Sequence, residues 1–93
     1  MSGARLTVRA RVTGRVQGVG FRAWTAEKAR DHGLGGWVKN EADGTVTALL
    51  SGPGEAVEAV LSACREGPPS AHVDQLTVEP ADTPVEPPFQ VRR

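Results

Sequence analysis

The sequence predicts an α+β fold in which two helices cover one face of a mostly antiparallel sheet of four or five strands. Its 93 residues suit one domain, which we expect to span residues 1–93. Apolar residues alternate at period two in several segments and recur at helical spacing in two others. These segments follow the order β-α-β-β-α-β with one more strand at the end, which is the split β-α-β, or ferredoxin-like, pattern.

The first part of the chain is predicted to form a strand, a glycine-rich loop and a helix. Residues 5–13 alternate polar and apolar side chains, which predicts a strand with one buried and one solvated face. The glycine-rich loop 14–20 follows this strand. Residues 21–32 then place Phe, Thr and Ala at four-residue intervals on one helix face, and Gly33 suits the left-handed position just after a helix.

A hairpin and a second helix make up the middle of the chain. Residues 37–40 and 45–51 are predicted as short strands, joined by a turn that contains the Asp-Gly pair typical of tight hairpins. The Gly52-Pro53 pair opens the second helix, with proline at the first helical position, where it is tolerated. This helix carries an apolar stripe at positions i, i+3, i+4 and i+7, formed by Val57, Val60, Leu61 and Cys64.

Prolines divide the last part of the chain into a strand, a linker and a final strand. Gly67-Pro68-Pro69 ends the second helix, because proline cannot continue it. Leu76 and Val78 mark a fourth strand. Four further prolines then punctuate a linker, after which residues 89–91 form the expected short last strand.

The charges of the chain sum to zero but are segregated along it. There are 11 basic and 11 acidic side chains, which counts against a non-specific polyanion binder. Residues 1–22 nevertheless hold five arginines and no acid, whereas residues 54–87 hold seven acids and one arginine. We therefore expect a positive local field at the glycine-rich loop.

Cysteine content and hydropathy predict a soluble protein of the cytoplasm. The single cysteine, Cys64, excludes a disulfide within the chain, which suits a reducing compartment. No apolar run approaches the ~18–20 residues of a membrane span. Residues 1–13 also lack the apolar core of a secretory signal. We therefore expect no membrane partner.

The glycine-rich loop has the features of an anion-binding site. Gly18 and Gly20 lie between a predicted strand and a helix start, where glycines let successive backbone N–H groups converge on one point. The positive end of the helix dipole would add to this site. Arg22, in the first turn of the helix, could direct its guanidinium onto two oxygens of a phosphate or carboxylate.

Other interpretations of this loop have less support. Gly18–Ala23 fits the G-x-G-x-x-[G/A] pattern of dinucleotide-binding folds, and Glu41 lies near the usual offset of a ribose-binding acid. However, the next strand runs into a hairpin, and the chain is too short for a two-half nucleotide fold. A P-loop would need Gly-Lys-Ser/Thr, which does not follow. From the loop alone, an anion site and a plain glycine turn both stay open.

Three sequence motifs together resemble the acylphosphatase family. They are Gly14–Arg22, Gly36–Asn40 and Asp43–Val46, and their spacing also fits. The similarity continues through the second helix to the final strand and so covers nearly the whole chain. The resemblance implies a small ferredoxin-like enzyme that hydrolyses the carboxyl–phosphate bond of acyl phosphates.

The resemblance also implies roles for individual residues. The phosphate-binding arginine of the family falls on Arg22, and its water-orienting asparagine falls on Asn40. The backbone phosphate cradle would be formed by Gln17, Gly18, Val19, Gly20, Phe21 and Arg22. Two residues depart from the family pattern. Gly20 stands where many relatives carry a larger residue, and the carboxylate of Glu41 beside a phosphate site would weaken anion binding.

The chemistry of this reaction matches the few polar residues available. An acyl phosphate expels a carboxylate whose conjugate acid has a pKa of ~4, so no general acid is needed. Asn40 is a poor base, but its carbonyl can accept a hydrogen bond from water, which suits a positioning role. His32 and His72 stand alone without metal-ligand spacing. We therefore expect no metal and no cofactor.

Two rival functions follow from the fold class. A ferredoxin-like sheet could serve as a non-catalytic RNA- or anion-binding module, but RNA-binding sheets stack bases on strand aromatics, and the first strand here has none. The domain could also serve a larger carbamoyl-transfer protein, although the sequence ends at Arg93 without a partner domain. The expected partner is a small-molecule acyl phosphate, with no nucleic acid, and we expect a monomer.

Overall fold

The computed structural model describes residues 4–93, so the first three residues of the predicted domain lie outside the described part. Its helices are α1 (Phe21–Asp31) and α2 (Gly54–Glu66). Its strands are β1 (Arg5–Arg15), β2 (Gly35–Asn40), β3 (Val46–Pro53), β4 (His72–Pro80) and β5 (Gln90–Arg92). No helix within residues 4–93 is long and apolar enough to cross a membrane.

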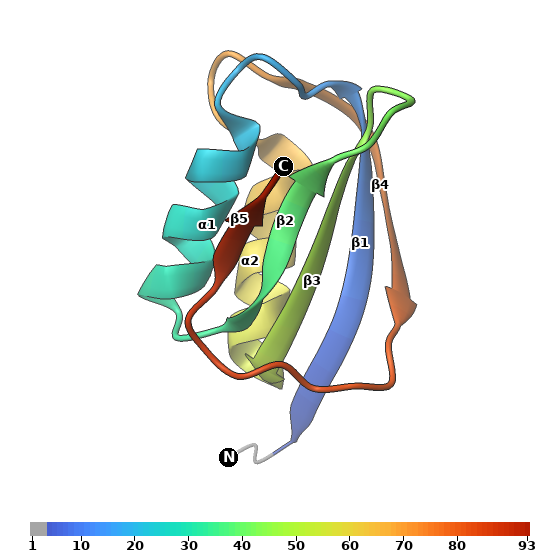
Figure 1. Ribbon diagram of the computed structural model, residues 1–93. Coiled ribbons are helices and arrows are strands. Elements are labelled where there is room, and N and C mark those ends of the chain that lie inside the picture. Colours follow the sequence, from blue (N-terminus) through green and yellow to red (C-terminus); the bar gives the residue numbers. More distant parts are fainter. Residues whose placement is uncertain (1–3) are drawn as a thin grey trace.

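The strands form one five-stranded sheet with the order β4-β1-β3-β2-β5, and both helices lie on one of its faces (Figure 1). All neighbouring pairs are antiparallel except β2 and β5, which are parallel. The predicted ferredoxin-like α+β fold is therefore confirmed. Because β1 and β2 both run antiparallel to β3, and β5 runs with β2, the C-terminal ends of β1, β2 and β5 share one edge of the sheet.

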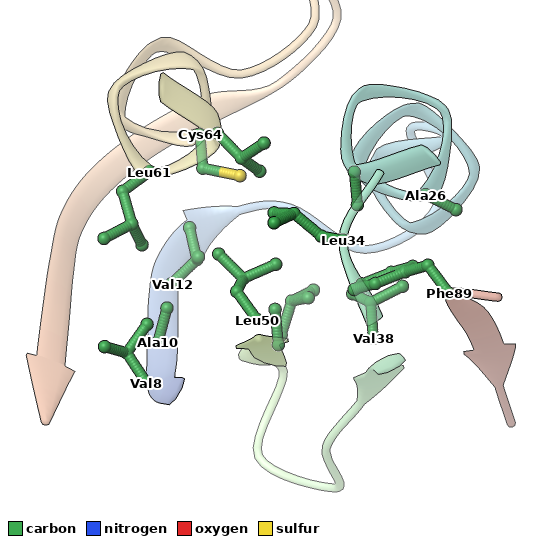
Figure 2. Close-up of a cluster of buried hydrophobic side chains, with 14 of the residues drawn as sticks. Val8, Ala10, Val12, Ala26, Leu34, Val38, Leu50, Leu61, Cys64 and Phe89 are labelled. Carbon is green, nitrogen blue, oxygen red and sulfur yellow. The ribbon is translucent and has the colours of Figure 1, made fainter. Parts of the chain in front are cut away.

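The hydrophobic core fills the space between the sheet and the two helices (Figure 2). Alternate residues of β1 point into it, as the period-two pattern predicted, and so does the whole predicted stripe of α2. Burial of these side chains is the main source of stability for such a layer pair. The largest fully buried members are Phe21, Phe89, Leu34 and Leu50.

Several element boundaries differ from the sequence prediction for identifiable reasons. Pro53 caps α2 instead of occupying its first turn, because β3 stays paired with β1 as far as Pro53. The last strand begins at Gln90, one residue later than predicted. The carbonyl of Phe89 accepts hydrogen bonds from Nε and Nη2 of Arg30 on α1, at 3.0 and 2.8 Å. That arginine fastens the short strand β5 to the helix layer.

The Cys64 thiol is buried in the core, as its place on the α2 stripe predicted. Its Sγ lies 4.0 Å from Oγ1 of Thr25 on α1. Burial disfavours the thiolate and raises the pKa of Cys64 to about 11. The thiol is therefore protonated and inert in the folded protein at neutral pH.

We predict that folded protein at pH 8 resists a thiol reagent such as DTNB and reacts only after unfolding. Because the pKa of Cys64 is raised from 9.0 to about 11, the associated stability is complete below pH 9 and is lost as pH rises through 11. The loss should amount to about 2–3 kcal/mol. Urea unfolding from pH 8 to 11 measures it, with Cys64→Ala as the control that lacks this pH dependence. Rapid labelling of folded protein would contradict the assignment.

Candidate active site

The predicted cradle lies in the loop that joins β1 to α1, at the edge where β2 also ends. Gly18 and Gly20 have φ angles of +75° and +79°, whereas no non-glycine residue of the described chain has a positive φ. Two glycines of positive φ therefore alternate with residues of negative φ along this loop. A loop of this kind can gather successive backbone N–H groups around a concavity that suits an anion.

The start of α1 adds to this concavity. Gly20 is the N-cap residue of this 11-residue helix, and no side chain caps the helix start. The first helical hydrogen bond runs from the Trp24 N–H to the Gly20 carbonyl at 3.0 Å. No acidic residue lies in the first turn, where it would compete with an anion. The N–H groups of the first turn and the positive end of the helix dipole therefore face the loop.

Arg22 lies in this first turn and is half-buried. Its Nη1 donates to the carbonyl oxygen of Arg92, at the end of β5, at 2.8 Å. A guanidinium has five N–H donors, so this bond leaves the others for an oxyanion. The contact fixes one end of the Arg22 side chain at the edge where the loop begins.

Asn40 is the last residue of β2 and therefore lies at the same edge. Its Oδ1 is buried and has no hydrogen-bond partner among residues 4–93. A buried acceptor without a donor costs about 1–3 kcal/mol, so this oxygen favours a bound group that can donate to it. The sequence predicted the residue, but its unpaired oxygen could be found only in the structure.

Gln17 has a side-chain contact that the sequence analysis missed. The sequence pattern assigned it only a backbone N–H in the cradle. In the structure, its Nε2 donates to the carbonyl oxygens of Glu41 and Thr45, at 2.8 and 2.9 Å. No sequence signal could have shown this, because the acceptors are backbone atoms of a distant turn.

Glu41 itself lines a shallow hollow on the open face of the sheet, the face away from the helices. Arg11 and Lys39 line the same hollow, so cations share that face with the carboxylate. Across the turn, Asp43 accepts hydrogen bonds from the N–H and Oγ1 of Thr45 at 3.0 and 2.7 Å, and Arg11 pairs with it at 2.6 Å. These hydrogen bonds from Thr45, more than the Arg11 charge, lower the pKa of Asp43.

The open face differs from the sheets that bind RNA through stacked aromatics. Trp37 lines its hollow, with Lys39 Nζ 5.9 Å and the Arg92 guanidinium 5.0 Å from its ring. Phe89, the aromatic residue just before β5, is 1 % exposed and belongs to the core. The charged residues lining the hollow are balanced in sign: Arg9, Arg11 and Lys39 against Glu41, Asp43 and Glu79.

The two histidines have hydrogen-bond or ion-pair partners of their own. His72 pairs with Asp74 at 3.1 Å on the exposed strand β4, and His32 bonds the Lys28 carbonyl at 2.9 Å. Within the described range 4–93, no three His, Cys, Asp or Glu side chains gather as a metal-binding group would.

The chain is similar to known proteins over most of its length. The family model for acylphosphatase matches residues 8–91. The acylphosphatase of Rhodospirillum rubrum is 58 % identical over 83 residues, which cover 89 % of this chain and 91 % of that protein.

Solved structures extend the comparison to the fold. An acylphosphatase from Coxiella burnetii superposes with a TM-score of 0.90 at 33 % identity, covering 95 % of this chain and 93 % of the other. The acylphosphatase from Bacillus subtilis also gives a TM-score of 0.90, at 36 % identity, covering 95 % and 99 %. The chain therefore belongs to the acylphosphatase family.

Proposed function

We propose that this protein hydrolyses the carboxyl–phosphate bond of small acyl phosphates without a metal ion or other cofactor. Family membership and relatives named acylphosphatase support the reaction class. The observation that carries the site assignment is the start of α1, which no side chain of residues 4–93 caps, behind a loop with positive φ at Gly18 and Gly20. In this proposal the phosphoryl group binds to Arg22 and to the backbone N–H groups of residues 17–22.

The reaction places few demands on side-chain chemistry. The water oxygen attacks phosphorus, the bond between phosphorus and the acyl oxygen breaks, and the carboxylate leaves with the electron pair. Because this leaving group is a weak base, no proton has to be delivered to it. The protein must hold the phosphoryl group, neutralise its oxygens and place the water in line.

Charge neutralisation is the task of the loop and Arg22. Charge develops on the phosphoryl oxygens in the transition state, and preorganised donors stabilise it without reorganising. The backbone N–H groups are fixed by the loop conformation, and the hydrogen bond to the Arg92 carbonyl fixes the Arg22 side chain before substrate arrives.

Placement of water is the task of Asn40. Among residues 4–93 its buried Oδ1 has no donor, and a water held there would supply one. The Asn40 side-chain NH2 can meanwhile donate to a phosphoryl oxygen, which links water and substrate in one geometry. Asn40 does not remove the proton. The protons of the attacking water pass to the phosphate oxygens or to solvent.

We also propose that the protein acts on its substrate as a monomer in the cytoplasm, with neither nucleic acid nor membrane as a partner. The reduced, buried Cys64 suits that compartment. The balanced charges and the single aromatic that line the hollow of the open face support the absence of a nucleic-acid partner.

The function is tested by incubating purified protein with benzoyl phosphate. We expect hydrolysis well above the buffer rate, inhibition by inorganic phosphate as a competitor, and no change on adding EDTA. No hydrolysis above buffer would refute the proposed activity. Complete loss on chelation would refute its independence of metal.

Arg22→Ala should reduce kcat/KM by about 10³-fold or more, because both phosphate binding and charge neutralisation are lost. Arg30→Ala is the matched control. Arg30 also lies on α1 and also donates to a carbonyl of the C-terminal segment, but two turns further from the loop. The Arg30→Ala variant should have a lower melting temperature and a nearly unchanged kcat/KM. Equal losses of kcat/KM in the two variants would contradict the role of Arg22.

Asn40→Ala should lower kcat by about 10²-fold through loss of water positioning. The inhibition constant of inorganic phosphate should rise by much less, because Arg22 and the backbone N–H groups supply most of the phosphate contacts and Asn40 supplies only one. Because the substitution removes a buried oxygen without a partner, the melting temperature should not fall. Steady-state kinetics and thermal unfolding check both parts. Full turnover in Asn40→Ala would show that another group positions the water.

A further inference from the structure

The side chain of Gln17 joins the phosphate loop to the turn between β2 and β3. Its Nε2 donates to the Glu41 and Thr45 carbonyl oxygens at 2.8 and 2.9 Å. An amide NH2 group has two hydrogens, so these two acceptors occupy both of them. Gln17 and Glu41 are 24 residues apart in sequence, and Gln17 is half-buried at the contact.

The two acceptors lie opposite one another at the base of the turn. The Glu41 N–H donates to the Thr45 carbonyl at 2.8 Å, and the Gly44 N–H donates to the Glu41 carbonyl at 3.2 Å. Within the turn, the Asp43 carboxylate accepts hydrogen bonds from the N–H and the Oγ1 hydroxyl of Thr45. Hydrogen bonds within the turn thus stabilise its shape, and the Gln17 side chain connects it to the phosphate loop.

Asn40 directly precedes Glu41, and its backbone pairs with Val46 of β3. Because the Asn40 Oδ1 has no hydrogen bond within the described residues, that atom does not tie the side chain to the phosphate loop. The position of the Asn40 side chain is therefore set by the backbone at the end of β2. The Gln17 side chain donates to the carbonyl of Glu41, the residue that follows Asn40.

We propose that Gln17 is a positioning residue whose side chain sets the place of Asn40 relative to the phosphate loop. The proposal rests on the proposed function, in which the loop holds the phosphoryl group and Asn40 holds the attacking water. In-line attack requires the reacting atoms about 3–3.5 Å apart and aligned, and a displacement of about 1 Å can cost about 10²-fold in rate. Gln17 therefore affects turnover through Asn40 and leaves phosphate binding to the backbone and Arg22.

The test is a double-mutant cycle with benzoyl phosphate as substrate and inorganic phosphate as competitor. It compares wild type, Gln17→Met, Asn40→Ala and the double variant. Methionine has nearly the shape of glutamine but donates no hydrogen bond. The matched control is Gln75→Met, since Gln75 is exposed on β4 and its side chain makes no hydrogen bond to residues 4–93.

We expect kcat of Gln17→Met to fall about tenfold or more, while the inhibition constant of phosphate changes less than about threefold. In the Asn40→Ala background the same substitution should change kcat by less than about twofold, because the positioned group is already absent. Gln75→Met should match wild type. A purely structural role for Gln17 would lower the melting temperature without producing this coupling.

Two results would overturn the proposal: equal effects of Gln17→Met in both backgrounds, or a phosphate inhibition constant that rises in step with the loss of kcat. If Gln17→Met does not fold, Gln17→Asn goes through the same cycle, since its side chain is one methylene too short to reach both carbonyls. Failure of the proposed function looks different. It would appear as an inactive wild type or a fully active Asn40→Ala, and either would overturn both proposals.

Discussion

The pairing of β3 with its two neighbours is the constraint on which the rest of the structure depends. From Val46 to Gly52 every residue of this strand is buried, and β1 and β2 pair with it antiparallel from opposite sides. Two strands that are both antiparallel to a third must point the same way. The residues that follow β1 and those that end β2 therefore meet at one edge of the sheet. The candidate site is a consequence of this arrangement, because the loop comes from one neighbour and Asn40 from the other.

The short strand β5 also ends at this edge of the sheet. Its three residues therefore lie close enough to contact a residue of the candidate site. β5 lies parallel to β2, and α1 holds it by two arginines. The Arg30 side chain donates to the carbonyl of Phe89, just before β5. The Arg22 side chain donates to the carbonyl of Arg92, at the end of β5. The first contact is purely structural in our account. The second joins the fold to the site, because Arg22 is also the proposed phosphate ligand.

Sequence reasoning predicted the layers and the element order, because these follow from local signals, whereas the candidate site residues came from the family resemblance. Periodicity identified the buried face of β1 and the stripe of α2, and the glycine pattern identified the loop. The boundaries at Pro53 and Phe89 were missed, since tertiary contacts decide both. The link from Gln17 to the turn was missed for the same reason, as its acceptors are backbone carbonyls that any residue would present. The roles of Arg22 and Asn40 stay predictions until they are measured.

The place of β1 in the sheet also bears on how the chain folds. Both of its partners, β3 and β4, lie later in the sequence, and β4 comes after both helices. Neither pairing can form until long loops close, and the entropy of closing them slows folding. During synthesis β1 is made before either of the two strands, β3 and β4, that flank it in Figure 1. The loop that follows β1 therefore cannot take up its final shape before β3 and the turn that precedes it have been made.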